Sequence, residues 1–362
     1  MEHLTEDEKR RLAKFNKEDQ AKILKLLKDK KNPPPLPEGT PVSIDDNESK
    51  NARCEEIEKS VISRYLAGQP FYTEENLKLM TETVNTLSSK LAFTKLAEPR
   101  YEPNGLGIQH DGKSRRLSMF LGAAGEKMRQ APIAVRFRSV LNVLDICTTR
   151  KFQFTEPANV DEPFLMFSIA RAEGDELDEP FTANPEAAEL FENSAKMWKE
   201  SPAGSAELAN IISAHRVPRV TKIIAFGLGL CCGEPKLCTS HRIQHQAVLT
   251  LRQLLEKKMG HKIEVYAQDP SYMPEDQDML KNYGIEADTH TSAGFLKVDG
   301  ETVVVSIGPN VPVKQIIGDL IIEDPTKKPA MIIWDNELYR PQYAEFWTKY
   351  KEPDYPKLYV DF

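Results

Sequence analysis

A glycine turn follows a buried strand pattern in the last third of the chain and could hold an anionic ligand. The strand pattern of residues 220–226 runs directly into Gly227-Leu228-Gly229. Glycine lets backbone N–H groups come close to a phosphate or a carboxylate. Asp269, at the end of the next expected strand, is placed to accept hydrogen bonds from ribose hydroxyls. This combination indicates a candidate site for a nucleotide-like small molecule.

The spacing of this turn differs from the known nucleotide fingerprints. The dinucleotide pattern needs a third glycine where Cys232 stands. It also needs an acid about 20 residues beyond the glycines, whereas Asp269 lies 40 residues after Gly229. The S-adenosylmethionine pattern fails too, because Ala225 and Cys231 replace its acid and its third glycine. A nucleotide-like site and a tight structural turn both stay open, and we favour the structural turn.

Other polar and small residues are expected at the same edge of the sheet. In an open α/β sheet, ligands bind beyond the carboxyl ends of the strands, where the strand order switches. Ser240 is expected to cap the helix after the glycine turn, and three further residues follow the last two expected strands. The candidate ligand-binding residues are Gly227, Gly229, Ser240, Asp269, Gly308, Asn310 and Asn336. They assign no cofactor.

Cysteines and histidines cluster between the glycine turn and the middle of the next expected helix. His241 and His245 are four residues apart, so one helical face could present both to a zinc ion, with Cys238 as a third ligand. However, the adjacent pair Cys231-Cys232 and the gap from it to Cys238 are not typical of structural zinc. We therefore favour buried structural thiols over a metal site. The helical wheel puts both histidines off the apolar stripe and predicts that solvent reaches them.

We find no motif of a known catalytic class. The chain has no Gly-x-Ser-x-Gly elbow, no Walker-type phosphate loop and no His-Glu-x-x-His pair. Asp335, at the end of the last expected strand, could act as a base, but acids at strand ends more often cap helices or lie in solvated turns. We assign no catalytic residue.

Strands and helices alternate over the part of the chain that must position these residues. Strands are expected at residues 220–226, 263–267, 285–287, 302–307 and 331–334. Helices are expected at residues 241–259, from Pro274 to Gly284 and at 312–322, with a hairpin around Asp299-Gly300. Such alternation is typical of a mostly parallel sheet covered on both faces. The sequence therefore predicts a Rossmann-like α/β domain.

The preceding half of the chain divides into three expected parts. Residues 1–32 form a charged amphipathic helix, 33–50 a proline-rich segment and 51–215 a mixed helical and strand region, before the α/β domain at 216–362. The proline run could be a ligand for a partner domain, but we favour a stiff linker. In the mixed region, the turn residues of 103–107 predict a loop, and 133–137 and 164–169 predict strands.

The composition argues against several classes of function. A net charge of −7 disfavours non-specific binding to nucleic acid or to acidic membranes, because both need a basic face. No apolar run approaches the about 18 residues that span a bilayer. The charged start lacks a signal core, and the five cysteines are an odd number, so we expect a reducing compartment, the cytoplasm or the nucleus.

Five ordered segments together resemble the Sensitivity-to-Red-light-Reduced-like (SRR-like) family, over roughly residues 190–345. They are KIIAFGLG at 222–229, Ser240 with Gln246-Ala247, VYAQDP at 265–270, TVVVSIGPNVP at 302–312 and MIIWDN at 331–336. Two segments depart from the family. Asn310 and Val311 replace the His and Cys of a Pro-His-Cys-Pro-like turn, and Asp335-Asn336 replaces a Gly-Asn pair.

The resemblance implies a eukaryotic regulatory protein, here a fungal-type member, from a family without a well-established catalytic activity. We therefore expect a protein that works through protein partners, with a strand edge that could sense a nucleotide-like small molecule. The alternative is a nucleotide- or S-adenosylmethionine-dependent transferase that uses the edge formed by Gly227 and Asp269. An open polar pocket at that edge would favour a sensor or an enzyme, and an edge filled by side chains would disfavour both.

Overall fold

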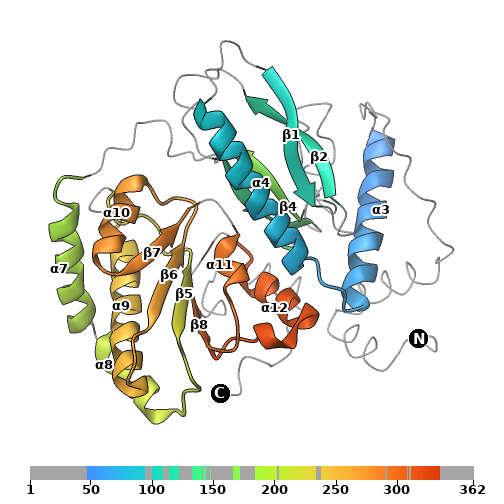
Figure 1. Ribbon diagram of the computed structural model, residues 1–362. Coiled ribbons are helices and arrows are strands. Elements are labelled where there is room, and N and C mark those ends of the chain that lie inside the picture. Colours follow the sequence, from blue (N-terminus) through green and yellow to red (C-terminus); the bar gives the residue numbers. More distant parts are fainter. Residues whose placement is uncertain are drawn as a thin grey trace, which may run out of the picture.

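The structure is a computed structural model (Figure 1). It describes residues 47–93, 100–108, 114–121, 133–140, 142–143, 147, 166–171, 184–201, 204–233, 238–289, 292–307, 309 and 311–334. The expected leader helix and most of the expected linker lie outside these residues. Four residues considered at the sheet edge also lie outside them, namely Gly308, Asn310, Asp335 and Asn336.

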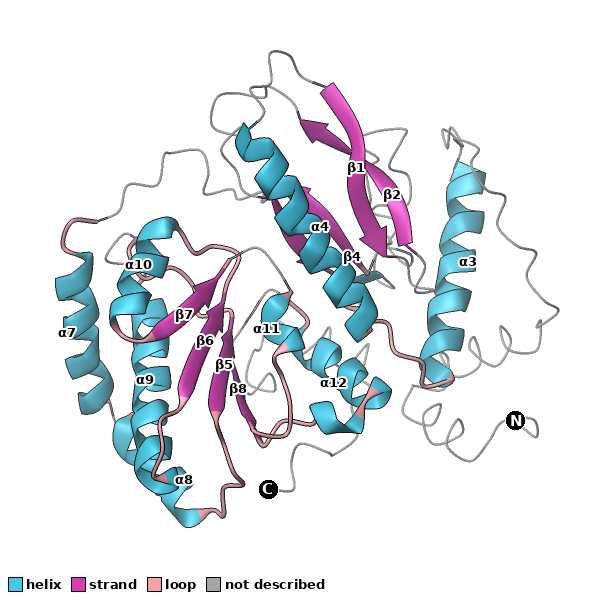
Figure 2. Ribbon diagram, in the orientation of Figure 1, coloured by secondary structure: helices cyan, strands magenta, loops and turns pink. Residues whose placement is uncertain are grey.

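A five-stranded parallel sheet forms the centre of the C-terminal part (Figure 2). Its strands are β5 (Lys222–Phe226), β6 (Glu264–Gln268), β7 (Ile285–Asp288), β8 (Thr302–Ser306) and β9 (Met331–Trp334). They lie in the order β7-β6-β5-β8-β9, and every neighbouring pair is parallel. The first strand, β5, lies in the middle of the sheet. The next two strands, β6 and β7, lie on one side of it, and the last two, β8 and β9, lie on the other side. The switch point of the strand order therefore lies between β5 and β8. The predicted Rossmann-like α/β class is confirmed.

Four helices of the described part of the chain cover one face of this sheet. They are α7 (Ala187–Glu200), α8 (Ser205–Ala214), α9 (Thr239–Met259) and α10 (Pro274–Asn282). Side chains alternate between the faces of a strand, and Ile223 and Ala225 of β5 point into this layer. There they share a core with Phe191 of α7 and with Val248 and Leu255 of α9. Burial of these side chains fixes α9 against the strand that leads into the glycine turn.

The opposite face is covered by α11 (Ala293–Leu296), by α12 (Val313–Glu323) and by the N-terminal region (Figure 1). That region contributes α3 (Asn47–Leu66) and α4 (Glu74–Phe93). One hydrophobic cluster joins Ile57 and Leu77 of these helices to Phe226 and Val304 of the parallel sheet and to Ile316 of α12. The N-terminal region and the α/β domain therefore share a core. In the described part of the chain no helix is long and apolar enough to cross a bilayer.

A second sheet lies in the N-terminal region and is antiparallel. It contains β1 (Arg100–Ile108), β2 (Ser114–Leu121), β3 (Ile133–Phe137) and β4 (Phe167–Arg171), in the order β2-β1-β4-β3. The prediction of a loop at 103–107 is wrong, because these residues belong to β1. The register with β2 shifts between Glu102 and Gly105. This irregularity accommodates Pro103, which has no N–H to donate.

Two local predictions in the α/β domain are also wrong. Helix α9 begins at Thr239 with Cys238 in the N-cap position, so Ser240 lies inside its first turn and does not cap it. The turn at Asp299-Gly300 does form, and Asp299 Oδ1 accepts hydrogen bonds from the Glu301 N–H and the Thr302 hydroxyl. However, it leads from α11 into β8 and closes no hairpin, because the described pairings of β7 and β8 are parallel and made with other strands.

Candidate functional site

The glycine turn lies at the switch point of the parallel sheet. Gly227 and Gly229 both have left-handed backbone angles, with φ of 72° and 75°. The Gly227 N–H donates to the carbonyl of Gln268 at the end of β6, over 3.0 Å. The Gly229 N–H donates to Asp269 Oδ2 over 2.7 Å. The topology thus brings the two glycines and the acid together, as their places after neighbouring strands predict.

Both glycines are in close contact with other residues of the chain. A Cβ on Gly227 would lie 2.7 Å from the Cβ of Pro309, which follows β8. A Cβ on Gly229 would lie 2.5 Å from the Cγ of His241, whose imidazole covers this glycine. Positive φ and close packing therefore both require glycine here. The glycine pattern has a structural explanation at each position.

The carboxylate of Asp269 is also used within the protein. The residue is only 5% exposed. Its Oδ2 accepts the Gly229 N–H, and its Oδ1 accepts the N–H of Ser271 over 2.8 Å. The backbone N–H of Asp269 donates to the Asp288 carbonyl at the end of β7. Asp269 thus joins the ends of three neighbouring strands. Ser240, another candidate ligand-binding residue, is exposed on the first turn of α9.

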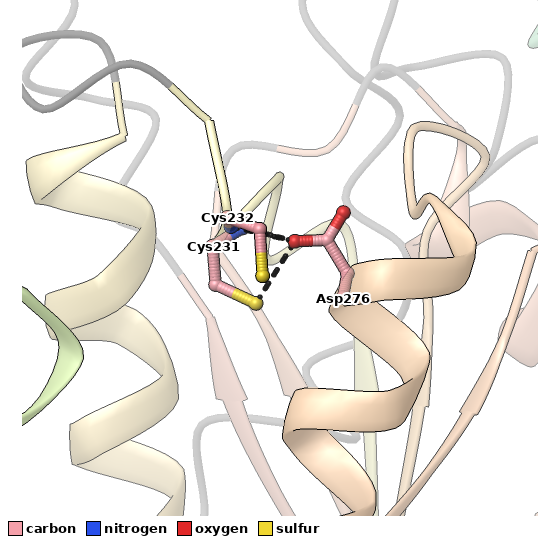
Figure 3. Close-up of side chains that lie close together, drawn as sticks. All are labelled: Cys231, Cys232 and Asp276. Carbon is pink, nitrogen blue, oxygen red and sulfur yellow. Dashed lines mark hydrogen bonds between the residues drawn. The ribbon is translucent and has the colours of Figure 1, made fainter. Parts of the chain in front are cut away.

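A second polar cluster lies just beyond the glycine turn and is buried (Figure 3). Oδ1 of Asp276 accepts the N–H groups of Cys231 and Cys232 over 2.8 and 2.7 Å. The same oxygen accepts the Cys231 thiol, with Sγ at 3.1 Å. Asp276 Oδ2 accepts the N–H of Met273 over 2.9 Å and so caps α10. One carboxylate therefore fixes both the cysteine turn and the start of α10.

The surroundings of this carboxylate keep a neighbouring thiol and a neighbouring imidazole uncharged. Contact with Cys232, burial and the nearby Asp276 carboxylate raise the pKa of the Cys231 thiol, so it stays protonated. Burial lowers the pKa of His245 to about 4. Its Nδ1 lies 2.7 Å from the His241 carbonyl and must donate to it, which leaves Nε2 to accept the Tyr272 hydroxyl over 2.9 Å. The imidazole is therefore neutral in one fixed tautomer.

The predicted solvent exposure of His245 is wrong. The side chain is 0% exposed, because Phe191 of α7 and Tyr272 before α10 pack against its ring. A helical wheel built on one apolar stripe cannot foresee that a second helix covers the other side of α9. Arg242 is buried as well and donates to the Cys231 carbonyl over 3.0 Å. His245 and Arg242 of α9 thus belong to the interior, whereas His241 is half-buried.

The candidate metal ligands Cys238, His241 and His245 do not form a ligand set. Both ring nitrogens of His245 are hydrogen-bonded, and the ring of His241 packs on Gly229. Among the residues that the structure describes, the group of metal-binding type is Cys231, Cys232 and Asp276, whose ligand atoms all lie within 4.8 Å of one another. Sequence reasoning identified the two cysteines but missed Asp276, because 44 residues separate it from Cys232.

Comparison with known proteins places the α/β part of the chain in a family. Residues 190–359 match the sequence model described as the SRR1 domain, and this stretch includes all five segments on which the family resemblance rests. No curated protein matches the chain. The matched stretch contains most of α7 and every strand of the parallel sheet. The C-terminal part of this chain, over residues 190–359, is therefore an SRR1 domain.

Proposed function

We propose that this chain is a regulatory protein whose SRR1 domain acts by binding a protein partner and not by catalysis. The family points in this direction. The observation that carries the proposal is the hydrogen bond of 2.7 Å between the Gly229 N–H and Asp269 Oδ2. A nucleotide would need the glycine N–H for its phosphate and the acid for its ribose. In this chain the two groups bind each other.

The surroundings of that bond strengthen the argument. A phosphate on the glycine turn would have to displace the imidazole of His241 from Gly229 and break the bond to Asp269. Leaving a buried donor or acceptor without a partner costs about 1–3 kcal/mol. Pro309 lies against Gly227 in the same way. These contacts disfavour both a nucleotide-dependent transferase and a small-molecule sensor at this edge.

A ligand screen tests the proposal at the sheet edge. The full chain would be heated with nucleotides, S-adenosylmethionine and haem, and its unfolding temperature recorded. A ligand at 100 times its Kd would add about 2.7 kcal/mol to stability. We expect no such stabilisation. The proposal would be contradicted by a stabilising ligand whose effect disappears in Asp269→Asn but persists in Asp278→Asn, a change at an exposed aspartate of α10.

A second experiment tests the partner. The protein in an extract of its own cells and the purified protein would be compared by gel filtration under the same conditions. We expect the native protein to elute at a larger size, and to return to the purified protein's elution volume when the complex is dissociated by salt. Identical elution volumes at every salt concentration would contradict a stable partner.

A further inference from the structure

Two thiols and one carboxylate converge inside the SRR1 domain in an arrangement suited to a metal ion (Figure 3). The three ligand atoms come from Cys231, Cys232 and Asp276 and lie within 4.8 Å of one another. Zinc binds thiolate sulfur at about 2.3 Å and carboxylate oxygen at about 2.0–2.2 Å, usually with tetrahedral geometry. In such a site two sulfur ligands are about 3.8 Å apart. Only a small contraction of this group would therefore be needed.

We propose that Cys231, Cys232 and Asp276 bind one divalent ion of the zinc class, with the fourth position open to water or a small exogenous ligand. Thiolates with one carboxylate are a ligand set for borderline-soft ions such as Zn²⁺, Co²⁺ and Cd²⁺. The proposal is independent of the regulatory function proposed above. It concerns a different set of atoms from the glycine turn and Asp269.

The ligand geometry is held in place by the backbone. The N–H groups of Cys231 and Cys232 both donate to Asp276 Oδ1, and the N–H of Met273 donates to Oδ2. These bonds fix the orientation of the carboxylate relative to both thiols. In metal sites such outer hydrogen bonds orient the ligands and strengthen binding. At the carboxylate the ion would replace the Cys231 S–H donor and leave the three N–H donors in place. The weak contact of the Cys232 S–H with Met279 Sδ, at 3.8 Å, would also be lost.

The charges of the cluster also balance with an ion present. Binding exchanges two protons for one metal ion: both thiols become thiolates, two protons are released, and no electron is transferred. Two thiolates and the Asp276 carboxylate carry three negative charges. The divalent ion and the buried guanidinium of Arg242, which donates to the Cys231 carbonyl, carry three positive charges. Buried charges need such compensation.

The adjacent cysteines explain why sequence spacing gave no sign of this site. Known zinc motifs place their paired cysteines two to four residues apart. Here the peptide bond joins the two thiol residues directly, and the third ligand comes from the first turn of α10. All three residues are buried. The ion must therefore enter through local opening or during folding, and binding is expected to be slow.

Cobalt binding to the full chain tests the proposal. The reduced, metal-free protein would be incubated with Co²⁺ until its spectrum is constant. We expect one equivalent to bind with the thiolate-to-cobalt charge-transfer absorption and visible bands of a tetrahedral site. The double variant Cys231→Ser/Cys232→Ser should lose this spectrum, and Asp276→Asn should weaken binding at least about tenfold. Cys54→Ser and Cys147→Ser, at buried cysteines of the N-terminal region, should leave it unchanged.

Two results would overturn the proposal. One is a folded wild-type chain that gives no charge-transfer absorption after prolonged incubation. The other is a spectrum that persists in the folded double variant. If the double variant does not fold, thiol alkylation of the wild type in mild denaturant replaces it. Cd²⁺ should then protect the Cys231-Cys232 peptide but not Cys54 or Cys147, and equal alkylation with and without Cd²⁺ would refute the site.

Discussion

The two faces of the parallel sheet are closed by different parts of the chain. The face under α7, α8, α9 and α10 is covered from within the SRR1 domain or directly at its start. Among the residues that the structure describes, α11 and α12 are the helices of the domain on the other face, and the core there continues into α3, α4, β3 and β4. An SRR1 domain cut at residue 190 would thus keep one complete layer and lose part of the other. The N-terminal region of this chain is part of the fold.

Each face also has a buried carboxylate that accepts backbone N–H groups from a distant segment. On the first face Asp276 of α10 accepts from the cysteine turn. On the second, Asp319 Oδ2 of α12 accepts the N–H groups of Phe71 and Tyr72 over 2.8 and 3.0 Å. The first bond lies within the domain, whereas the second ties the domain to the turn between α3 and α4. These two carboxylates let the faces be compared by single substitutions.

The largest effect is expected from deletion of residues 1–183. It would expose the apolar side chains of Phe226, Val304 and Ile316, which share a hydrophobic core with the N-terminal helices. We expect a loosely packed state that binds a hydrophobic dye and melts without a sharp transition. Calorimetry and near-ultraviolet circular dichroism would check this. A sharp transition close to that of the full chain would show that the domain closes both faces alone.

Asp276→Ala should be the most damaging of the point substitutions. It leaves the buried N–H groups of Cys231 and Cys232, and the partly buried N–H of Met273, without their acceptor. Each unsatisfied buried group costs about 1–3 kcal/mol, so we expect a loss of about 4 kcal/mol in the free energy of unfolding. Urea unfolding measures it. Asp276→Asn keeps one oxygen and should lose less, and equal losses for the two variants would contradict this account.

Asp319 should make stability depend on pH. Burial raises its pKa to about 7, against the lowering effect of the N–H groups of Tyr72 and Phe71. Arg64 also lowers this pKa and Glu323 raises it. Because the unfolded pKa is about 3.9, the folded state binds the proton more tightly. The stabilisation of the folded state that comes from binding this proton is complete below about pH 3.9, and it is lost as the pH rises through about 7.

Asp319→Asn removes this titration and keeps an oxygen for the two N–H donors. Relative to the wild type, the variant should gain stability between pH 5 and pH 8, on the order of 3 kcal/mol. Urea unfolding at several pH values gives the difference between the two proteins. A difference that does not change with pH would contradict the buried carboxylate. His245 has the opposite effect. Because its pKa is lowered to about 4 in the folded state, its contribution to the stability of the protein is lost as the pH falls from about 6.5 through about 4.

The smallest effect is expected from alanine substitutions at two glycines. Comparing them separates the cost of backbone strain from the cost of close packing at the glycine turn. Gly229 and Gly260 have nearly the same φ, 75° and 74°. An added Cβ meets the His241 ring at Gly229 and nothing within 4 Å at Gly260. Gly260→Ala should cost about 1 kcal/mol from strain alone, and Gly229→Ala about 1–3 kcal/mol more from overpacking. Equal costs in urea unfolding would mean that His241 moves away easily.

Much of the fold could be predicted from the sequence. Apolar runs bounded by glycine and proline located all five parallel strands, with β5 and β6 within two residues of the expected ends. The meeting of Gly229 and Asp269 also followed, since strand ends share one edge of a parallel sheet. These features depend on residues near in sequence or on a general rule of topology.

The remaining features depend on contacts between distant segments. No local pattern reveals that the His241 ring covers Gly229, that Asp276 bonds the cysteine turn or that Asp319 binds the α3–α4 turn. Turn residues also gave a wrong prediction of a loop where they lie in an irregular strand, as around Pro103 in β1. Periodicity shows which face of an element is apolar. It does not show which segment covers the other side.

Amide hydrogen exchange at Gly229 tests the central functional claim most directly. If its N–H is bonded to the buried carboxylate of Asp269, exchange requires local opening and the amide should be strongly protected. Exchange would be followed residue by residue by nuclear magnetic resonance, with and without nucleotides and S-adenosylmethionine. We predict a protected Gly229 amide that none of these ligands affects. An amide that exchanges freely, or one that becomes protected only when a nucleotide is added, would contradict a closed sheet edge and favour a ligand site.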